Sequence, residues 1–391
     1  EQGVIIDKIK LMLKNYLELD NVSFLFGSGT SIHLGAVAIR NFPHDVETYI
    51  VEKNKATEYD GIYDEFETTV KALQNDFLKY GRKNLDVGSK DSFKNEKGWK
   101  FHIEDELVRD STDGEIVLEY EKILNYLIAK DFVLEEDKSK ERTDKITHLI
   151  STIKEGLFNV CHLEKRPVSQ TIIDRKKASN FTKEIEQGKL LETKSKYIFH
   201  EKFLKALLQR PLNLRRANIF TANYDLAFEY AFDKLGVHYI DGFSGFHKRY
   251  FKPETFEYDI FYPGSTTSGK VQRIEKVVRY YKLHGSLSWV NSESRDANNL
   301  YGIEEKPLES IESLEKKGEI IIYPSAIKKS YTLDLPYSEL FRQFASTITQ
   351  SQSVLVTVGY AFADDHFNDI IYQALSNPTF TLIVVDFQGT Q

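Results

Sequence analysis

Two glycines, Gly27 and Gly29, follow directly on an apolar run at residues 24–26. Glycine lets the backbone bend sharply and come close to a ligand. Thr30 and Ser31 come next, and these residue types suit the start of a helix, whose free N–H groups bind phosphate. The spacing therefore predicts a nucleotide-binding turn between a first strand and a helix. A turn of this kind needs glycine in any case, so a purely structural turn explains the two glycines equally well.

Three later apolar runs also end in polar residues or in glycine. Asn223 and Asp225 follow the first of these runs. His284 follows the second, and Gly359 ends the third. An amide side chain can orient a water molecule, and a histidine can act as a general base near pH 7. The structural alternatives are that Asn223 and Asp225 only cap a helix and that His284 is a loop histidine without a catalytic role.

These residues need a scaffold, and the apolar runs indicate which one. Strands are predicted near residues 24–26, 219–221, 280–283, 354–358 and 382–385. The run at residues 354–358 is rich in β-branched residues, which is typical of a central parallel strand. Open α/β sheets bind ligands at the carboxyl ends of their strands. We therefore predict an α/β fold, a Rossmann-like doubly wound parallel sheet, with the site at that edge.

The motifs, taken in order, resemble those of the sirtuin superfamily. That family carries a glycine-rich loop, then Thr-x-Asn-x-Asp, then His-Gly, then a strand ending in glycine, and finally a strand that contacts adenine. The resemblance covers about residues 18–40 and 216–391. The matching positions are Gly27, Gly29, Ser31, Gly35, Arg40, Thr221, Asn223, Asp225, His284, Gly285, Gly359, Tyr360 and residues 384–386.

The chain also departs from the protein deacylases of that family. Those enzymes carry a zinc module of four cysteines after the His-Gly motif, whereas the one cysteine here, Cys161, precedes His284. Ala222 replaces the glutamine before the asparagine, and residues 36–39 lack the aromatic side chain that shields the reacting ribose. Thr-x-Asn-Tyr-Asp together with Gly-Tyr-x-Phe resembles instead the sirtuin-like effector domains of bacterial antiphage systems, which hydrolyse NAD.

The resemblance implies an NAD⁺ hydrolase that releases nicotinamide and ADP-ribose and depletes NAD in antiphage defence. NAD is then the substrate, and no metal is expected. Two alternatives stay open, an NAD-dependent protein deacylase and a non-catalytic module that senses NAD or ADP-ribose. The resemblance assigns catalysis to Asn223, His284 and Asp225, and NAD binding to Gly27, Ser28, Gly29, Thr30, Ser31, Arg40, Thr221, Gly359, Tyr360 and Asp386.

Composition narrows the function classes further. A net charge of −7 argues against a dominant nucleic-acid-binding surface. One cysteine excludes an intrachain disulfide and fits a reducing compartment. Neither a signal peptide nor an apolar span of about 18 residues is visible, so we expect a cytoplasmic protein without membrane contact.

Residues 41–215 differ from the rest, being rich in Lys, Glu and Asp with apolar residues at helical spacing, as at residues 115–128, 145–154 and 197–208. We predict a helical insertion subdomain within an NAD-binding domain formed by residues 1–40 and 216–391. The insertion is either an ordinary structural subdomain or a surface for oligomerisation or a partner.

A constantly active NADase would kill its host, so an inactive state is expected. A homo-oligomer is predicted, with a DNA-translocating ATPase or another defence-system protein as candidate partner. The polar residues 291–318 predict a flexible loop.

Overall fold

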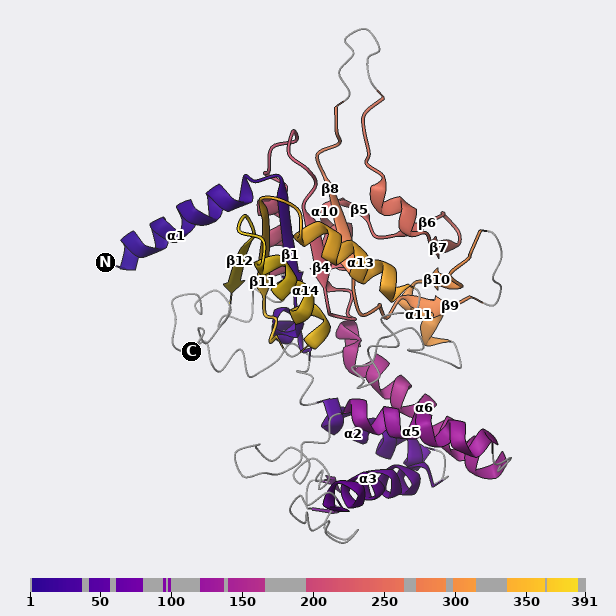
Figure 1. Ribbon diagram of the computed structural model, residues 1–391. Coiled ribbons are helices and arrows are strands. Elements are labelled where there is room, and N and C mark those ends of the chain that lie inside the picture. The colour runs from indigo at the N-terminus through magenta and orange to yellow at the C-terminus, as the bar shows by residue number, and fades with distance from the viewer. Residues whose placement is uncertain are drawn as a thin grey trace. The chain divides into compact units, whose positions relative to one another are not determined.

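The computed structural model describes residues 2–36, 42–56, 61–79, 94–95, 98–99, 120–136, 140–165, 195–263, 272–292, 298–313, 336–362 and 364–385. Contacts between residues divide the chain into two compact units (Figure 1). The first consists of Glu1–Ala36, Leu163–Leu308 and Thr332–Gln391, and the second of Val37–His162 and Glu309–Tyr331. Every candidate site residue that the structure describes therefore belongs to the first unit.

The first unit is built on a six-stranded parallel sheet. Its strands are β1 (Asn21–Phe26), β4 (Asn218–Thr221), β5 (His238–Ile240), β8 (Val277–Lys282), β11 (Ser353–Val358) and β12 (Thr381–Val385). They lie in the order β12-β11-β1-β4-β8-β5, and all neighbouring pairs are parallel. The predicted Rossmann-like parallel sheet is confirmed. After β1 the chain goes first to β4 on one side and later to β11 on the other, so a topological switch point lies beside β1.

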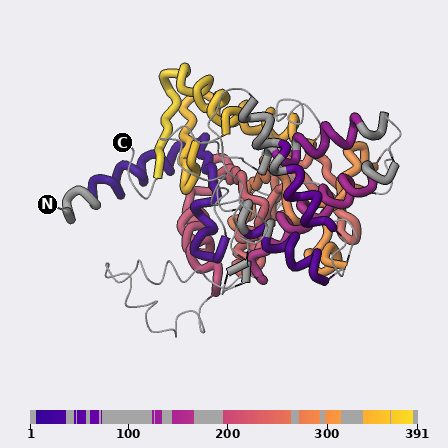
Figure 2. The backbone as a smooth tube through the Cα atoms, turned by 90° about the horizontal axis from the view of Figure 1, so that it is seen from below, coloured from indigo at the N-terminus to yellow at the C-terminus, as the bar shows by residue number. Residues whose placement is uncertain are grey.

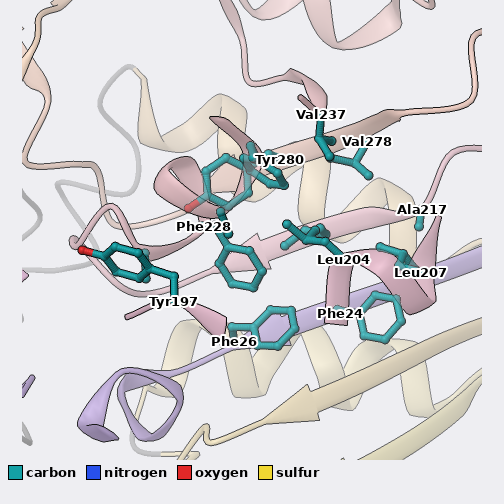
Figure 3. Packing of buried hydrophobic residues seen from close by; sticks show 14 of the residues in the cluster. Phe24, Phe26, Tyr197, Leu204, Leu207, Ala217, Phe228, Val237, Val278 and Tyr280 are labelled. Atoms are coloured by element: carbon teal, nitrogen blue, oxygen red, sulfur yellow. The ribbon is translucent and has the colours of Figure 1, made fainter. Parts of the chain in front are cut away.

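Helices cover both faces of this sheet. Figure 2 shows the backbone turned by 90° from the view of Figure 1. On one face, α9 (Ile198–Leu207) and α10 (Ala227–Leu235) pack with the strands in the apolar cluster drawn in Figure 3. On the other face lie α13 (Tyr337–Ile348) and α14 (Asp365–Leu375). There the Phe344 ring packs edge to face against Phe220 of β4 and Phe367 of α14, at centroid distances of 4.9 Å and 5.7 Å. The site at the sheet edge thus rests on a scaffold packed from both sides.

The apolar sequence of β1 follows from this two-sided packing. Val22, Phe24 and Phe26 belong to the cluster with α9 and α10. Leu25 alternates with them and is also fully buried. Successive side chains of a strand point to opposite faces, so a central strand needs apolar residues on both.

The described part of the second unit is mainly helical. Its helices are α2 (Phe42–Ala56), α3 (Ile62–Lys79), α5 (Tyr120–Glu136) and α6 (Lys140–Cys161), and a short hairpin joins β2 (Lys94–Asn95) to β3 (Gly98–Trp99). The predicted helices at residues 115–128 and 145–154 correspond to α5 and α6, although residues 115–119 lie outside the described residues. The helix predicted at residues 197–208 is α9, which packs in the first unit even though the insertion was expected to extend to residue 215.

A small antiparallel sheet completes the first unit. Its strands are β6 (Phe243–Ser244), β7 (Arg249–Phe251), β9 (Trp289–Asn291) and β10 (Ile303–Glu305), in the order β6-β7-β10-β9. The loop predicted over residues 291–318 is wrong in its described part, which contains β10 and α11 (Leu308–Glu312). Ile303, Leu308 and Ile311 are buried in this segment, but three apolar residues among charged ones are too few to show a clear period.

The chain begins with helix α1 (Gln2–Leu17), which leads into β1. Along its described length α1 carries exposed apolar side chains, Ile9, Leu11 and Met12. Across the part of the chain that the structure describes, no helix has both the length and the apolar character that a membrane crossing requires.

Candidate active site

The carboxyl ends of adjacent strands lie level with one another. Phe26, the last residue of β1, pairs in register with Thr221 of β4 and with Val358 of β11. Thr221 pairs in turn with Lys282, the last residue of β8. Because the strands are parallel, the loops that follow them meet at one edge of the sheet, beside the switch point. These loops carry the candidate residues Gly27, Asn223, His284 and Gly359.

The glycine loop after β1 forms two 3-10 turns, at Ser28–Thr30 and Ile32–Leu34. The prediction that a phosphate-binding helix begins at Thr30 is therefore wrong. Gly35 ends the second turn in the left-handed region, with φ 93°, and a right-handed helix does not continue through such a residue. Arg40, the next candidate, lies outside the described residues.

Three glycines lock this loop against the loop after β11. A Cβ atom added to Gly27 would lie 2.5 Å from the carbonyl oxygen of Gly359, and one added to Gly29 would lie 2.8 Å from its Cα. Gly359 has φ +60°, and its own added Cβ would lie 2.8 Å from the amide nitrogen of Thr30. Contact between two backbones therefore requires glycine at these positions, whether or not a ligand approaches.

The hydrogen bonds of the loop limit how it can hold phosphate. The amide groups of Gly27 and Gly29 donate to the carbonyls of Val358 and Gly359, and those of Thr30 and Ser31 donate within the loop. Among the described residues, none accepts a hydrogen bond from the amide of Ser28. Ser31 is fully buried, with 1% of its surface exposed. Ser28 is thus the loop residue best placed to donate to a pyrophosphate.

Asn223 joins the loop after β4 to the glycine loop. Its side-chain nitrogen lies 3.1 Å from the Gly27 carbonyl oxygen, 3.3 Å from Thr30 Oγ1 and 3.2 Å from Ser31 Oγ. Its backbone amide donates to Thr221 Oγ1 at 3.0 Å, which gives Thr221 a supporting role. The side-chain oxygen of Asn223 accepts no hydrogen bond from the described residues, so it can accept one from a water molecule.

Asp225 lies at the start of α10. Its carboxylate accepts a hydrogen bond from the Ala227 amide at 3.0 Å, which is the capping contact that the sequence left open. The side chain is buried, with 9% of the residue exposed. Its role at the nicotinamide end of NAD stays a prediction.

A buried charge network lies beside the Asn-Tyr-Asp segment. Lys282 is 4% exposed, donates to the carbonyl oxygens of Tyr224 and Asp225, and pairs with Glu229 at 2.9 Å. Tyr280 donates to the other carboxylate oxygen of Glu229 at 3.1 Å. Burial raises the pKa of Glu229, against the opposing effect of the Lys282 charge. Sequence reasoning missed this network, because its side chains are separate polar positions on one strand, β8, and one helix, α10.

His284 pairs with a carboxylate from the loop after β11. Its Nε2 lies 3.0 Å from Asp364 Oδ2, and both side chains are at most 10% exposed. Asp364 also caps α14 by accepting from the His366 amide at 3.2 Å. The His284 ring lies against Phe367 at 5.0 Å and near Tyr224 at 6.3 Å between centroids. The carboxylate fixes the orientation of the imidazole ring.

Asp364 was not among the predicted site residues. The available signal was its position at the start of Asp-Asp-His, just after Gly-Tyr-x-Phe. The candidate Tyr360 lies in the same loop, and its hydroxyl donates to the Asp364 carbonyl at 3.4 Å. Burial raises the pKa of Tyr360, so its hydroxyl stays protonated near neutral pH. The candidate Asp386 lies outside the described residues. No set of three or more His, Cys, Asp or Glu within the described ranges is arranged to hold a metal ion.

One of two comparisons with known proteins supports the sirtuin-like motifs. No significant match to this chain is found among curated proteins. Residues 217–381 match the family model of the SIR2-like domain. The match includes Asn223, His284 and Asp364, while the glycine loop precedes it. SIR2-like domains bind NAD, and the match supports an NAD-related function and a place for this part of the chain in the sirtuin-like superfamily.

Proposed function

We propose that the protein hydrolyses the N-glycosidic bond of NAD⁺. The observation that carries the proposal is the convergence of Asn223 with the paired His284 and Asp364 at the switch point of a SIR2-like sheet. Asn223 is anchored on the glycine loop through its nitrogen and presents an unoccupied carbonyl oxygen. A binding module needs neither an oriented amide nor a histidine held by a carboxylate.

The reaction breaks the bond between the ribose C1′ and the nicotinamide nitrogen and forms a bond between C1′ and a water oxygen. Its products are nicotinamide, ADP-ribose and a proton. Nicotinamide leaves readily because its ring nitrogen carries the positive charge of NAD⁺. The protein then has to hold the ribose, stabilise an oxocarbenium-like centre and place a water. The Asn223 oxygen orients that water by accepting one of its protons in a hydrogen bond.

His284 takes one of two roles in this scheme, proton acceptor from the water or hydrogen-bond partner of a ribose hydroxyl. Asp364 supports either role, since its carboxylate at 3.0 Å holds the ring in place. As acceptor, His284 becomes an imidazolium that the adjacent carboxylate stabilises. Ser28 donates to the pyrophosphate, and Gly359 and Tyr360 lie at the neighbouring loop.

Protein deacylation is the second candidate activity, and the residues favour it less. The chain has one cysteine, so it cannot form a zinc module of four cysteines. Residues 36–39 lack the aromatic residue that shields the ribose in the deacylases, and its absence opens the anomeric carbon to water. A sensing module without catalysis is the third candidate.

We further propose that NAD depletion serves antiphage defence, on the strength of the Thr-x-Asn-Tyr-Asp and Gly-Tyr-x-Phe patterns. The enzyme then needs an inactive state, controlled by self-assembly or by a partner such as a DNA-translocating ATPase. Expression of the wild-type gene and of Asn223→Ala in phage-challenged bacteria tests this role. Protection and NAD loss should both require Asn223.

One assay separates the three activities. Purified protein is incubated with NAD⁺, with and without an acetyl-lysine peptide, and nicotinamide release is followed. Release without peptide supports hydrolysis, and release only with peptide supports deacylation. If NAD⁺ binds but nicotinamide is released under neither condition, nor from phage-infected cells expressing the protein, the sensing module is supported.

A further inference from the structure

A cavity of about 340 Å³ lies at the opposite edge of the sheet from the candidate active site. Asn21 and Asn218, the first residues of β1 and β4, contribute to its wall. A strand rises by about 3.3 Å per residue, so Asn218 and Thr221 are roughly 10 Å apart along β4. The active site of the proposed hydrolase does not account for a cavity at this edge, because α/β sheets bind their substrates at the carboxyl ends.

The cavity wall carries more arginines than carboxylates to pair with them. Two of its arginines, Arg216 and Arg273, share the carboxylate of Asp259, at 3.0 Å and 3.1 Å. A third, Arg215, donates to the neutral oxygens of Asn21 and Gln350, at 3.2 Å and 2.8 Å. One carboxylate therefore serves two guanidinium groups, and Arg215 has only neutral partners within hydrogen-bond distance.

The fourth arginine, Arg279 of β8, lines the same cavity. Its Nε is shielded from solvent and has no hydrogen-bond partner. No ion pair joins its guanidinium to any of the described residues. The wall has two further carboxylates, but both belong to exposed residues, Asp20 and Glu257. A buried donor without an acceptor costs free energy that an anionic ligand can recover.

We propose that this cavity binds a small phosphate-bearing anion. Guanidinium groups match phosphate oxygens in pairs, and a phosphate has enough oxygens to meet several arginines at once. Gln343 and Thr347 of α13 line the cavity and offer neutral hydrogen bonds to the rest of such a ligand. The volume falls within the range of small-molecule sites, about 300–1,000 Å³. The ligand is distinct from the substrate, because the site lies at the other end of the strands.

The test is calorimetric titration of the whole protein with inorganic phosphate and, separately, with AMP. Arg279→Gln removes the unpaired charge and should weaken binding of the phosphate group about tenfold or more. Arg342→Gln is the matched control, because Arg342 is exposed on α13, pairs with Glu339 and does not line the cavity. It should leave the affinity unchanged.

A second pair of variants covers the case in which Arg279→Gln does not fold. Ser346 lines the cavity and is exposed, so Ser346→Glu places a carboxylate there without disturbing the core, and Ser346→Gln adds the same bulk without charge. The glutamate should weaken binding about tenfold relative to the glutamine. Tighter binding of AMP than of phosphate identifies a nucleotide as the ligand class, and equal binding identifies the phosphate alone. Absence of saturable binding at up to about 10 mM ligand, or equal affinities for the Glu and Gln variants, would overturn the proposal.

Discussion

Asn223→Ala separates the chemistry of the site from its architecture. The proposed mechanism gives Asn223 two functions, since its nitrogen contacts the glycine loop and its oxygen accepts no hydrogen bond from the described residues. An NH₂ group has two protons, so at most two of the three contacts at 3.1–3.3 Å are full hydrogen bonds at once. Each is worth about 0.5–1.5 kcal/mol, so the variant should lose about 1–3 kcal/mol of unfolding free energy.

The expected loss of rate is larger than the loss of stability. Removing a group that positions the reacting water should lower kcat for nicotinamide release about 10²–10⁴-fold, equivalent to about 3–5 kcal/mol of activation free energy. Stopped-time nicotinamide assays give kcat and KM, and urea unfolding gives the stability change. NAD⁺ should still bind, because the glycine loop and Gly359 keep their backbones.

Thr30→Val is the comparison that tests the reasoning. It removes one acceptor of the Asn223 amide and its own hydrogen bond to the Gly27 carbonyl at 2.7 Å, but it leaves the Asn223 oxygen in place. We expect it to loosen the loop and to change KM more than kcat. If Thr30→Val lowers kcat as much as Asn223→Ala does, Asn223 only anchors the loop. Near-normal turnover by Asn223→Ala would refute the mechanism while leaving the fold intact.

Three further perturbations address other parts of the site and its support. Asp364→Asn keeps the helix cap but removes the charge beside His284. We therefore expect the rate of nicotinamide release to fall about 10- to 100-fold with little change in Tm. An unchanged rate would show that Asp364 has no part in the mechanism. Gly359 and Gly236 have nearly equal φ, +60° and +61°, but only at Gly359 would an alanine place its Cβ 2.8 Å from the Thr30 amide nitrogen. Thermal unfolding should therefore show a larger loss of stability for Gly359→Ala than for Gly236→Ala, beyond the ~1–2 kcal/mol cost of a left-handed alanine. Equal losses of stability would contradict the close contact of the two glycine backbones. Burial raises the pKa of Glu305 to about 8, above its usual ~4.3, so this carboxyl favours the folded state most at low pH and that contribution is lost as the pH rises through 8. Glu305→Gln should therefore weaken the fall of Tm between pH 5 and pH 9, and an identical pH profile would show that Glu305 does not titrate in this range.

Five of the six strands of the parallel sheet were predicted, because burial on two faces gives strands such as β1 and β11 continuous apolar sequences. The sixth, β5, was missed, because it has three residues and they form no apolar run. Asn223 and His284 were predicted as site residues because each follows directly on an apolar run. The two 3-10 turns after β1 were not predicted, because the sequence shows the glycines but does not show that Gly35 adopts the left-handed conformation that ends the second turn.

Other features depend on contacts that no local pattern records. The pairing of Lys282 with Glu229 spans 53 residues, and each residue alone resembles an exposed polar position. The strands β6, β7, β9 and β10 have two or three residues each, which is too short for alternation to show. Asp364 was not predicted as a site residue, because its partner His284 follows a different strand and no local pattern joins the two.

The placement of β1 between β4 and β11 makes completion of the site a late event in synthesis. Asn21 at the start of β1 bonds to Ser351, 330 residues further along the chain. At about 5–20 residues per second, a ribosome needs roughly 15–70 s to cover that distance. Until then β1 has one unpaired edge, and the glycine loop lacks Gly359 to rest against and His284 lacks Asp364. A chain that ends before β11 therefore has the glycine loop and His284 but lacks both of the partners that complete the candidate site.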